Sequence, residues 1–353
     1  MDGEGERAAE FCGGLADVDY WRSALDPSIA GCRVQELPGG FSPSQIYRIH
    51  FTYHGNALGR QSVVCKETAH SWPDSDPRGF EREWCVYHQC LAHLPVVGPE
   101  LLYSERSARG NRLVLVDLDL EHYFLSSHHV WNAAEINPVL ETLARLHVAA
   151  EELPLAEVDI LMPAPDERWT AREIMEARTS LEGEARFGKQ ARELHGVVEI
   201  LLERQAREKE MWKEQPRTLL HSDFNARNVA FQRRGGEAQL IDWHIAAGGM
   251  AAFEVASLFY QPHRNHRNLD AGEMLGEYLN CRRRLGGRVE DRAVEWGAFR
   301  YAMAGDGLSY LPPIARAARQ EGGLAGWWAN MFENIRDNLK WCATDAATAI
   351  PCL

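Results

Sequence analysis

Alternating apolar and polar positions predict β-strands in the first third of the chain. Residues 32–37, 45–51 and 62–66 are rich in β-branched and aromatic side chains, and 112–117 is a further apolar run of this kind. A Pro-Gly-Gly-Phe-Ser segment at 38–42 separates the first two runs and is typical of a turn. The front of the chain is therefore expected to form a β-sheet.

Apolar residues recur at helical spacing after the third strand and through most of the remaining chain. Helices are expected at 80–94, 136–150, 169–213 and 251–342. One β-hairpin, with strands at 229–231 and 239–241, interrupts this helical part. The pattern predicts an α+β protein with a β-rich front and a mainly helical back.

The strongest chemical signal lies in and beside this hairpin. His221, Asp223 and Asn228 have the spacing HxDxxxxN, and Asp242 follows in the sequence Leu-Ile-Asp-Trp at the end of the next strand. Phosphoryl transfer requires one carboxylate that orients the attacking hydroxyl and accepts its proton. It also requires an amide oxygen and a second carboxylate that hold Mg²⁺ on the nucleotide phosphates. The alternative is a buried polar loop with an Asp cap.

These segments resemble the catalytic and metal-binding loops of the aminoglycoside/choline phosphotransferase superfamily, whose pattern is H-G-D-x-x-x-x-N followed by I-D-W. The resemblance implies a protein-kinase-like two-lobed fold with ATP and Mg²⁺ as cofactors. A nucleotide-binding lobe with a small antiparallel sheet and one helix would span 1–117, and a larger helical lobe would span 118–353. Asp223 would be the catalytic base, and Asn228 and Asp242 would bind Mg²⁺.

Two histidines near apolar segments are interpreted as structural residues. His221 is expected to fix the catalytic loop by hydrogen-bonding to backbone, with an acid or base role as the alternative. His147 lies on the apolar stripe of the 136–150 helix and is expected to be a core histidine.

A kinase also needs a cation over the nucleotide phosphates, usually a strand lysine paired with a helix glutamate. Lys66 ends a predicted strand and is the only lysine before Lys189. In the following helix, Glu83 lies about 60° from the apolar stripe and Glu81 about 100° from it, so Glu83 is the predicted partner. The superfamily pattern F-x-R-E-x-x-x-Y also matches 80–87. An ordinary surface pair is the alternative.

The resemblance also assigns nucleotide contacts to two loops. The turn that covers the nucleotide corresponds to Gly39, Gly40, Phe41 and Ser42. Its glycines would let backbone N–H groups approach phosphate, and an ordinary hairpin turn is the alternative. Asp117 and Leu118 would begin the hinge between the lobes, where backbone groups read adenine. The sequence has no GxxxxGK[ST] loop and no GxGxxG fingerprint, so rival nucleotide-binding folds lack support.

The acceptor is expected to be a hydroxyl of a small molecule. Protein kinases carry Arg where this chain has Ser222, and D-F-G where it has Asp242-Trp-His. A helix expected near Ala251 leaves too little chain for a platform that binds a peptide. A non-catalytic nucleotide-binding pseudokinase and a protein kinase are the alternatives.

The family often has D-P-A-x-D-L-A shortly after the metal-binding Asp, and Glu254 stands here in place of its second Asp. This departure indicates a divergent branch. The Gly-Gly-Phe turn, the strand that contains Lys66 and the Phe-x-Arg-Glu pattern resemble ecdysteroid-kinase-like and choline-kinase-like members.

The C-terminal helices are expected to supply the acceptor pocket. Aromatic rings and carboxylates can clamp a cationic acceptor, and the candidates are Trp296, Tyr301, Asp306, Trp327, Trp328 and Glu333. Packing of the tryptophans between helices is the alternative reading.

Composition limits the partners and the compartment. The formal net charge of -13 disfavours nucleic acid, whose phosphates need a basic surface, and is compatible with a cationic acceptor. No segment has the length of a membrane span, and the acidic N-terminal residues lack the order of a signal peptide. The eight cysteines have no CxxC or zinc spacing, so reduced thiols in a cytoplasmic protein are expected.

Overall fold

The computed structural model divides the chain into two compact units, Met1–Tyr123 and Phe124–Leu353. The structure describes residues 14–37, 44–55, 59–69, 77–94, 97–107, 110–118, 122–124, 132–155, 158, 160–184, 186–212, 215–224, 226–235, 237–258, 270–319 and 325–344.

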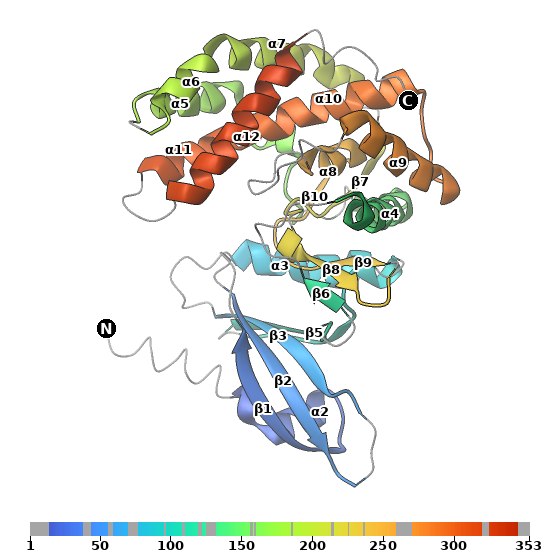
Figure 1. Cartoon of the computed structure of the whole chain (residues 1–353). Helices are drawn as coiled ribbons and strands as arrows, with labels where there is room; N and C mark the ends of the chain where they lie inside the picture. Colours follow the sequence, from blue (N-terminus) through green and yellow to red (C-terminus); the bar gives the residue numbers. More distant parts are fainter. Residues whose placement is uncertain are drawn as a thin grey trace. The chain divides into compact units, whose positions relative to one another are not determined.

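The first unit contains a five-stranded antiparallel sheet with the strand order β1-β2-β3-β5-β4 (Figure 1). Its strands are β1 (Ile29–Leu37), β2 (Gln45–Tyr53), β3 (Ser62–Ala69), β4 (Leu101–Arg106) and β5 (Gly110–Val116). The four strands that the sequence pattern predicts are all present. The pattern does not predict β4, because residues 101–105 are all half-buried and show no two-residue period.

Two helical segments belong to the same unit. In α2 (Val18–Ala24), Trp21 is fully buried in the core against the sheet, in T-shaped contact with Phe51. The helix expected at 80–94 begins three residues earlier with a proline, as α3 (Pro77–Cys85). It continues as a π-helical segment over Val86–Cys90 and a 3₁₀ turn over Leu91–His93.

Strand β3 carries two buried charges on opposite faces. Val63 and Cys65 point into the core that contains Trp21, and Glu67 follows them at the two-residue period of a strand. Lys66 therefore lies on the other face. Because both charged side chains are buried, each requires a partner inside the unit.

The partner of Glu67 is Arg112, which lies opposite it in register on β5. Arg112 Nε donates to Glu67 Oε1 at 2.6 Å, and a second guanidinium nitrogen lies 3.3 Å from Glu105 on β4. The guanidinium also lies over the Tyr20 ring of α2, 4.7 Å from its centroid. One buried cation thus connects three strands of the sheet to α2.

The second unit is mainly helical and contains two antiparallel pairs of short strands (Figure 1). Strand β7 (Arg217–Leu220) pairs with β10 (Ala247–Met250), and β8 (Val229–Gln232) pairs with β9 (Ala238–Leu240). The helices are α4 (Ala133–Ala150), α5 (Ala171–Glu182), α6 (Gly188–Glu193), α7 (His195–Trp212), α8 (Ala251–Ser257), α9 (Ala271–Arg284), α10 (Arg292–Ser309), α11 (Leu311–Arg319) and α12 (Ala325–Ala343). Strand β6 (His122–Phe124) lies at the boundary between the units.

The sequence predicts the helices of this unit but not their breaks. The 169–213 segment divides into α5, α6 and α7, and Gly183 caps the end of the first of these. The hairpin of β8 and β9 is present as predicted. Strands β7 and β10 are missing from the prediction, because four-residue strands that are buried along nearly their whole length have no alternating pattern.

His147 is a core histidine, as expected from its place on the apolar stripe of α4. Its Nδ1 lies 2.7 Å from the hydroxyl of Tyr278 on α9. Burial lowers the pKa of His147 well below its ordinary value, so the ring is neutral. Among the described helices, none combines the length and the apolar composition that a membrane span requires.

We predict that Arg112→Leu lowers the free energy of unfolding by about 3–5 kcal/mol, because it leaves the Glu67 carboxylate buried without its cation. The double variant Glu67→Leu/Arg112→Leu should recover most of this loss. Urea denaturation measures both values. Arg106→Leu is the matched control, because its pair with Glu81 is exposed and should contribute less than about 1 kcal/mol. Equal effects of the two single arginine variants would contradict the prediction.

Candidate active site

Asp223 lies in the loop that leaves β7, and Asn228 ends the 3₁₀ turn that leads into β8. The Asn228 Nδ2 donates to the Asp223 carboxylate at 2.8 Å and to the Asp223 carbonyl at 2.9 Å. These bonds close the loop on itself. They also point the amide oxygen of Asn228 away from that carboxylate.

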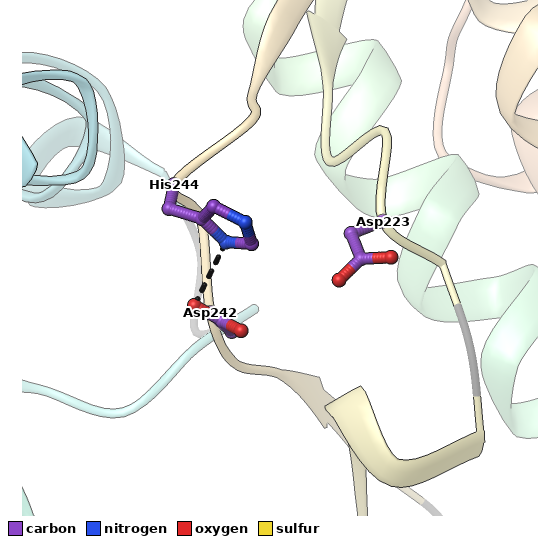
Figure 2. A group of neighbouring side chains, drawn as sticks. All are labelled: Asp223, Asp242 and His244. Atoms are coloured by element: carbon purple, nitrogen blue, oxygen red, sulfur yellow. Dashed lines mark hydrogen bonds and ion pairs between the residues drawn. The ribbon is translucent and has the colours of Figure 1, made fainter. Parts of the chain in front are cut away.

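Asp242 lies directly after β9 and faces the same space as Asp223, together with His244 (Figure 2). One ligand atom of each of these three side chains lies within 4.8 Å of the others. The His244 Nδ1 is 2.9 Å from Asp242 Oδ1. The backbone N–H of Ile241 donates a hydrogen bond of 3.0 Å to the Asn228 carbonyl. This bond connects the segment that carries Asp242 to the loop that carries Asp223.

His221 supports the loop that carries Asp223 through hydrogen bonds at both of its ring nitrogens. Its Nδ1 accepts the N–H of Asp223 at 3.3 Å, so its Nε2 carries the proton and donates to the Ile241 carbonyl at 2.7 Å. The ring packs edge-on against Trp243, with centroids 4.6 Å apart. Burial lowers the pKa of His221, which keeps the ring neutral. The loop-fixing interpretation is confirmed.

Glu254 on α8 anchors the start of the same loop. Its buried carboxylate accepts the backbone N–H of His221 and that of Ser222, the latter at 3.2 Å. Among the described residues other than glycine, only Ser222 (φ 65°) and Asp242 (φ 69°) have a positive φ. That conformation costs energy in residues with a side chain, so it persists only where other contacts fix it.

The carboxylate environment around Glu254 is unusual. Burial raises the pKa of Glu254 to about 7, against the two backbone hydrogen bonds that favour the charged form. Asp306 on α10 is also buried with a pKa raised to about 7, and it contributes to the shift of Glu254. The charge of Arg168 lowers both values.

In the first unit, the predicted pairing of Lys66 with Glu83 is present. The Lys66 Nζ lies 2.6 Å from Glu83 Oε2, and the two side chains are 7% and 1% exposed. Glu81, the rejected candidate, instead pairs with Arg106 at the surface. The two-residue period of β3 directs the lysine away from the core around Trp21, and α3 places the glutamate on its inner face.

The residues assigned to the hinge are part of the first unit. The Asp117 carboxylate accepts bonds from Arg48 Nε at 2.7 Å and from the Ser62 hydroxyl at 2.6 Å. The Leu118 carbonyl accepts the N–H of His122 at 2.8 Å. The Asp117 side chain thus anchors the end of β5 to β2 and β3. The turn of Gly39, Gly40, Phe41 and Ser42 lies outside the described residues.

A family model described as the phosphotransferase enzyme family matches residues 33–287. The chain belongs to this family. The match includes both the Lys66–Glu83 pair and the loop that carries Asp223, Asn228 and Asp242. No curated protein sequence matches the chain.

Solved structures with the same fold include two kinases. An ethanolamine kinase from Plasmodium vivax is 13% identical, with a TM-score of 0.58 over 98% of this chain and 95% of its own. An amicoumacin kinase is 12% identical, with a TM-score of 0.59 over 96% of this chain and 93% of its own. The α+β, protein-kinase-like fold class is confirmed. An aminoglycoside-3'-phosphotransferase of type VIII is 18% identical, with a TM-score of 0.44 over 82% of this chain and 98% of its own.

The residues of this phosphotransferase fit a divalent cation with nucleotide phosphates. Hard cations such as Mg²⁺ bind carboxylate and amide oxygens, and Asp242 and Asn228 offer one of each on neighbouring segments. The group of Asp223, Asp242 and His244 is compact enough to surround one ion. The donor set therefore suits the metal that the family implies.

Four of the six candidates for the acceptor pocket of the phosphotransferase have described side chains, and one of these four, Asp306, is buried on α10. Trp296 is buried, stacked on Phe299 with centroids 5.4 Å apart, and in edge contact with Trp341. Tyr301 donates its hydroxyl to Asp166 at 2.8 Å, and Glu333 is exposed. The side chains of Trp327 and Trp328 lie outside the described part of the chain. Core packing accounts for Trp296.

Sequence reasoning assigned no role to two residues of the site. His244 lies two positions after Asp242, and a nitrogen donor so close to a metal-binding carboxylate is a signal that could have been used. The sequence identifies Glu254 only as a residue that replaces an Asp of the family pattern. The retained carboxylate, in a segment that is otherwise apolar, indicates a buried acceptor that needs backbone donors.

We predict that the contribution of Glu254 to the stability of this phosphotransferase declines between about pH 4.5 and about pH 7, because its carboxyl group takes up a proton on folding in this window. A folded-state pKa above the unfolded value of 4.5 gives stability that is present at low pH and lost as the pH rises through about 7. In Glu254→Gln, residue 254 does not ionise. The slope of the unfolding free energy against pH, measured by urea denaturation at pH 5, 6 and 7, should therefore be less negative than in the unmodified protein. Part of the slope will remain, because Asp306 titrates in the same window.

The matched control is Glu199→Gln, because Glu199 is an exposed residue of α7. Its slope should equal that of the unmodified protein. If the unfolding free energy of Glu254→Gln changed with pH as it does in the unmodified protein and in Glu199→Gln, the prediction would be wrong.

Proposed function

We propose that this protein transfers the γ-phosphate of ATP to a hydroxyl group of a small molecule, with Mg²⁺ as the metal. The observation that carries this proposal is the convergence of Asp223, Asn228 and Asp242 on one loop and the adjoining hairpin. Phosphoryl transfer depends on positioning and on charge neutralisation, and these three groups can position the acceptor and hold the metal that neutralises charge.

In this proposal Asp223 is the catalytic base. It orients the acceptor hydroxyl and accepts its proton, while the bond from Asn228 Nδ2 fixes the direction of its carboxylate. The carboxylate of Asp242 and the amide oxygen of Asn228 hold the metal. Bound Mg²⁺ would neutralise charge on the β- and γ-phosphate oxygens.

Lys66 is proposed to bind nucleotide phosphate oxygens, with Glu83 holding its ammonium group in place. We also propose that the turn of Gly39, Gly40, Phe41 and Ser42 covers the phosphates and that backbone at Asp117 and Leu118 reads adenine. The amicoumacin kinase supports the choice of nucleotide, since its structure is a complex with AMP-PNP.

A small-molecule acceptor is supported by the short connection after Asp242. Strand β10 and then α8 follow at once, with α8 beginning at Ala251, so no platform for a peptide is formed there. Two proteins with the same fold, an ethanolamine kinase and an amicoumacin kinase, are also kinases of small molecules. The net charge of -13 favours an acceptor that carries a cationic group. The proposed use of ATP supports a cytoplasmic location.

We predict that Asp223→Asn lowers kcat by about 10²- to 10⁴-fold, because the acceptor hydroxyl loses its base. ATP consumption should be measured with Mg²⁺ and a panel of acceptors that contains aminoglycosides, choline, ethanolamine, amino alcohols, nucleosides and sterols. Nucleotide binding by the variant should change little. Asp337→Asn, on the surface of α12, is the matched control and should keep full activity.

Undiminished turnover in Asp223→Asn would reject the proposed base. Magnesium-dependent ATP binding without turnover of any acceptor would favour a non-catalytic nucleotide-binding protein, and phosphorylation of a polypeptide would favour a protein kinase.

We predict that Lys66→Met lowers kcat/KM for ATP by about 10²- to 10³-fold, because one phosphate-binding cation is removed. The variant also leaves Glu83 buried without its cation, so a loss of stability must be separated from a loss of function. The double variant Lys66→Met/Glu83→Gln should regain stability in thermal denaturation but not activity.

Lys340→Met is the control for this lysine, because Lys340 pairs with Glu193 at the surface. Activity that returns with stability in the double variant would show that Lys66 has only a structural role.

A further inference from the structure

His244 is placed beside the candidate metal ligands in a way that the proposed reaction does not require. It lies in the turn after Asp242, and both side chains are 24% exposed. The ring faces the same space as the carboxylates of Asp242 and Asp223 (Figure 2). A metal ion can therefore reach its nitrogen from the side that the two carboxylates share.

The distance between His244 and Asp242 matches that of two neighbouring ligands on one ion. Adjacent ligand atoms on an octahedral ion with bonds of about 2.1 Å lie about 3.0 Å apart. The His244 Nδ1 and Asp242 Oδ1 are 2.9 Å apart. Without a metal, the same contact is a hydrogen bond from Nδ1–H to the carboxylate, which holds the ring in that position.

His221, also close to Asp223, cannot serve in this way. Both of its ring nitrogens are engaged, one as acceptor of the Asp223 N–H and one as donor to the Ile241 carbonyl. Its side chain is also fully buried. Among the described residues of the site, His244 is thus the imidazole that a metal ion can use.

We propose that His244 is a protein ligand of the metal in this site, and that its nitrogen raises the affinity of the site for Mn²⁺ relative to Mg²⁺. This inference rests on the proposed function, since it concerns the ion that the nucleotide brings. Mg²⁺ binds oxygen donors and loses water reluctantly, whereas first-row transition ions accept an imidazole readily. A site with one carboxylate, one amide oxygen and one imidazole therefore discriminates between the two ions in a way that an all-oxygen site does not.

The test uses the full-length protein with Mn²⁺ and AMP-PNP, with ¹⁵N incorporated only in histidine. Electron spin-echo measurements on bound Mn²⁺ should show ¹⁵N modulation from a directly bound imidazole. In His244→Phe, which keeps a ring but has no nitrogen, the modulation should disappear. Mn²⁺ affinity should fall about 10- to 100-fold, with a smaller change for Mg²⁺.

The matched control is His195→Phe, because His195 is an exposed histidine on α7. This variant should keep both the modulation and the affinity. The measurement on the unmodified protein does not require either variant to fold.

Three results would overturn the inference, and they differ in what else they reject. Nucleotide-dependent Mn²⁺ binding without ¹⁵N modulation would remove His244 from the metal but leave the proposed function intact. Absence of any metal binding with AMP-PNP would reject the proposed function together with this ligand. Modulation that survives in His244→Phe would assign the nitrogen to another histidine.

Discussion

The site of the second unit depends on one buried carboxylate. Glu254 accepts the backbone N–H groups of His221 and Ser222, at the point where the chain leaves β7. Ser222 has a left-handed conformation that a residue with a side chain adopts only under constraint. This strained residue directly precedes Asp223, so the bonds to Glu254 set the direction in which the candidate base points. The neutral ring of His221 adds a second support through its hydrogen bond to the carbonyl of Ile241, the residue before Asp242.

The first unit also depends on buried charged side chains, each of which is held by a partner of opposite charge. A strand exposes alternate residues to opposite faces, so Lys66 and Glu67 cannot share a partner. Arg112 neutralises one of them and Glu83 the other. The pair on the side of α2 holds the sheet together. The pair on the side of α3 fixes the position of the ammonium group that we propose binds nucleotide phosphate.

These examples explain how much could be read from the sequence. Lys66 and Glu83 were predictable because strand and helix periods alone decide which face each occupies. The loop of Asp223 and Asn228 was predictable because its chemistry requires side chains at a fixed spacing. Strands β7 and β10 were not, since short buried strands carry no period. Trp296 shows that sequence composition cannot distinguish an aromatic side chain that binds a ligand from one that packs in the core.

The same reasoning explains why the loop needs so many supports. Two carboxylates whose oxygens lie within 4.8 Å repel each other when both are charged. Asn228 donates to one of them and His244 lies against the other, which offsets part of that repulsion. A divalent cation near both carboxylates would replace this net repulsion with attraction of both groups to the cation. In the proposed reaction, the energy stored by holding Asp223 and Asp242 together would be recovered on binding of the metal with its nucleotide, so the contacts of Glu254 and His221 would convert stability of the fold into affinity for a cation.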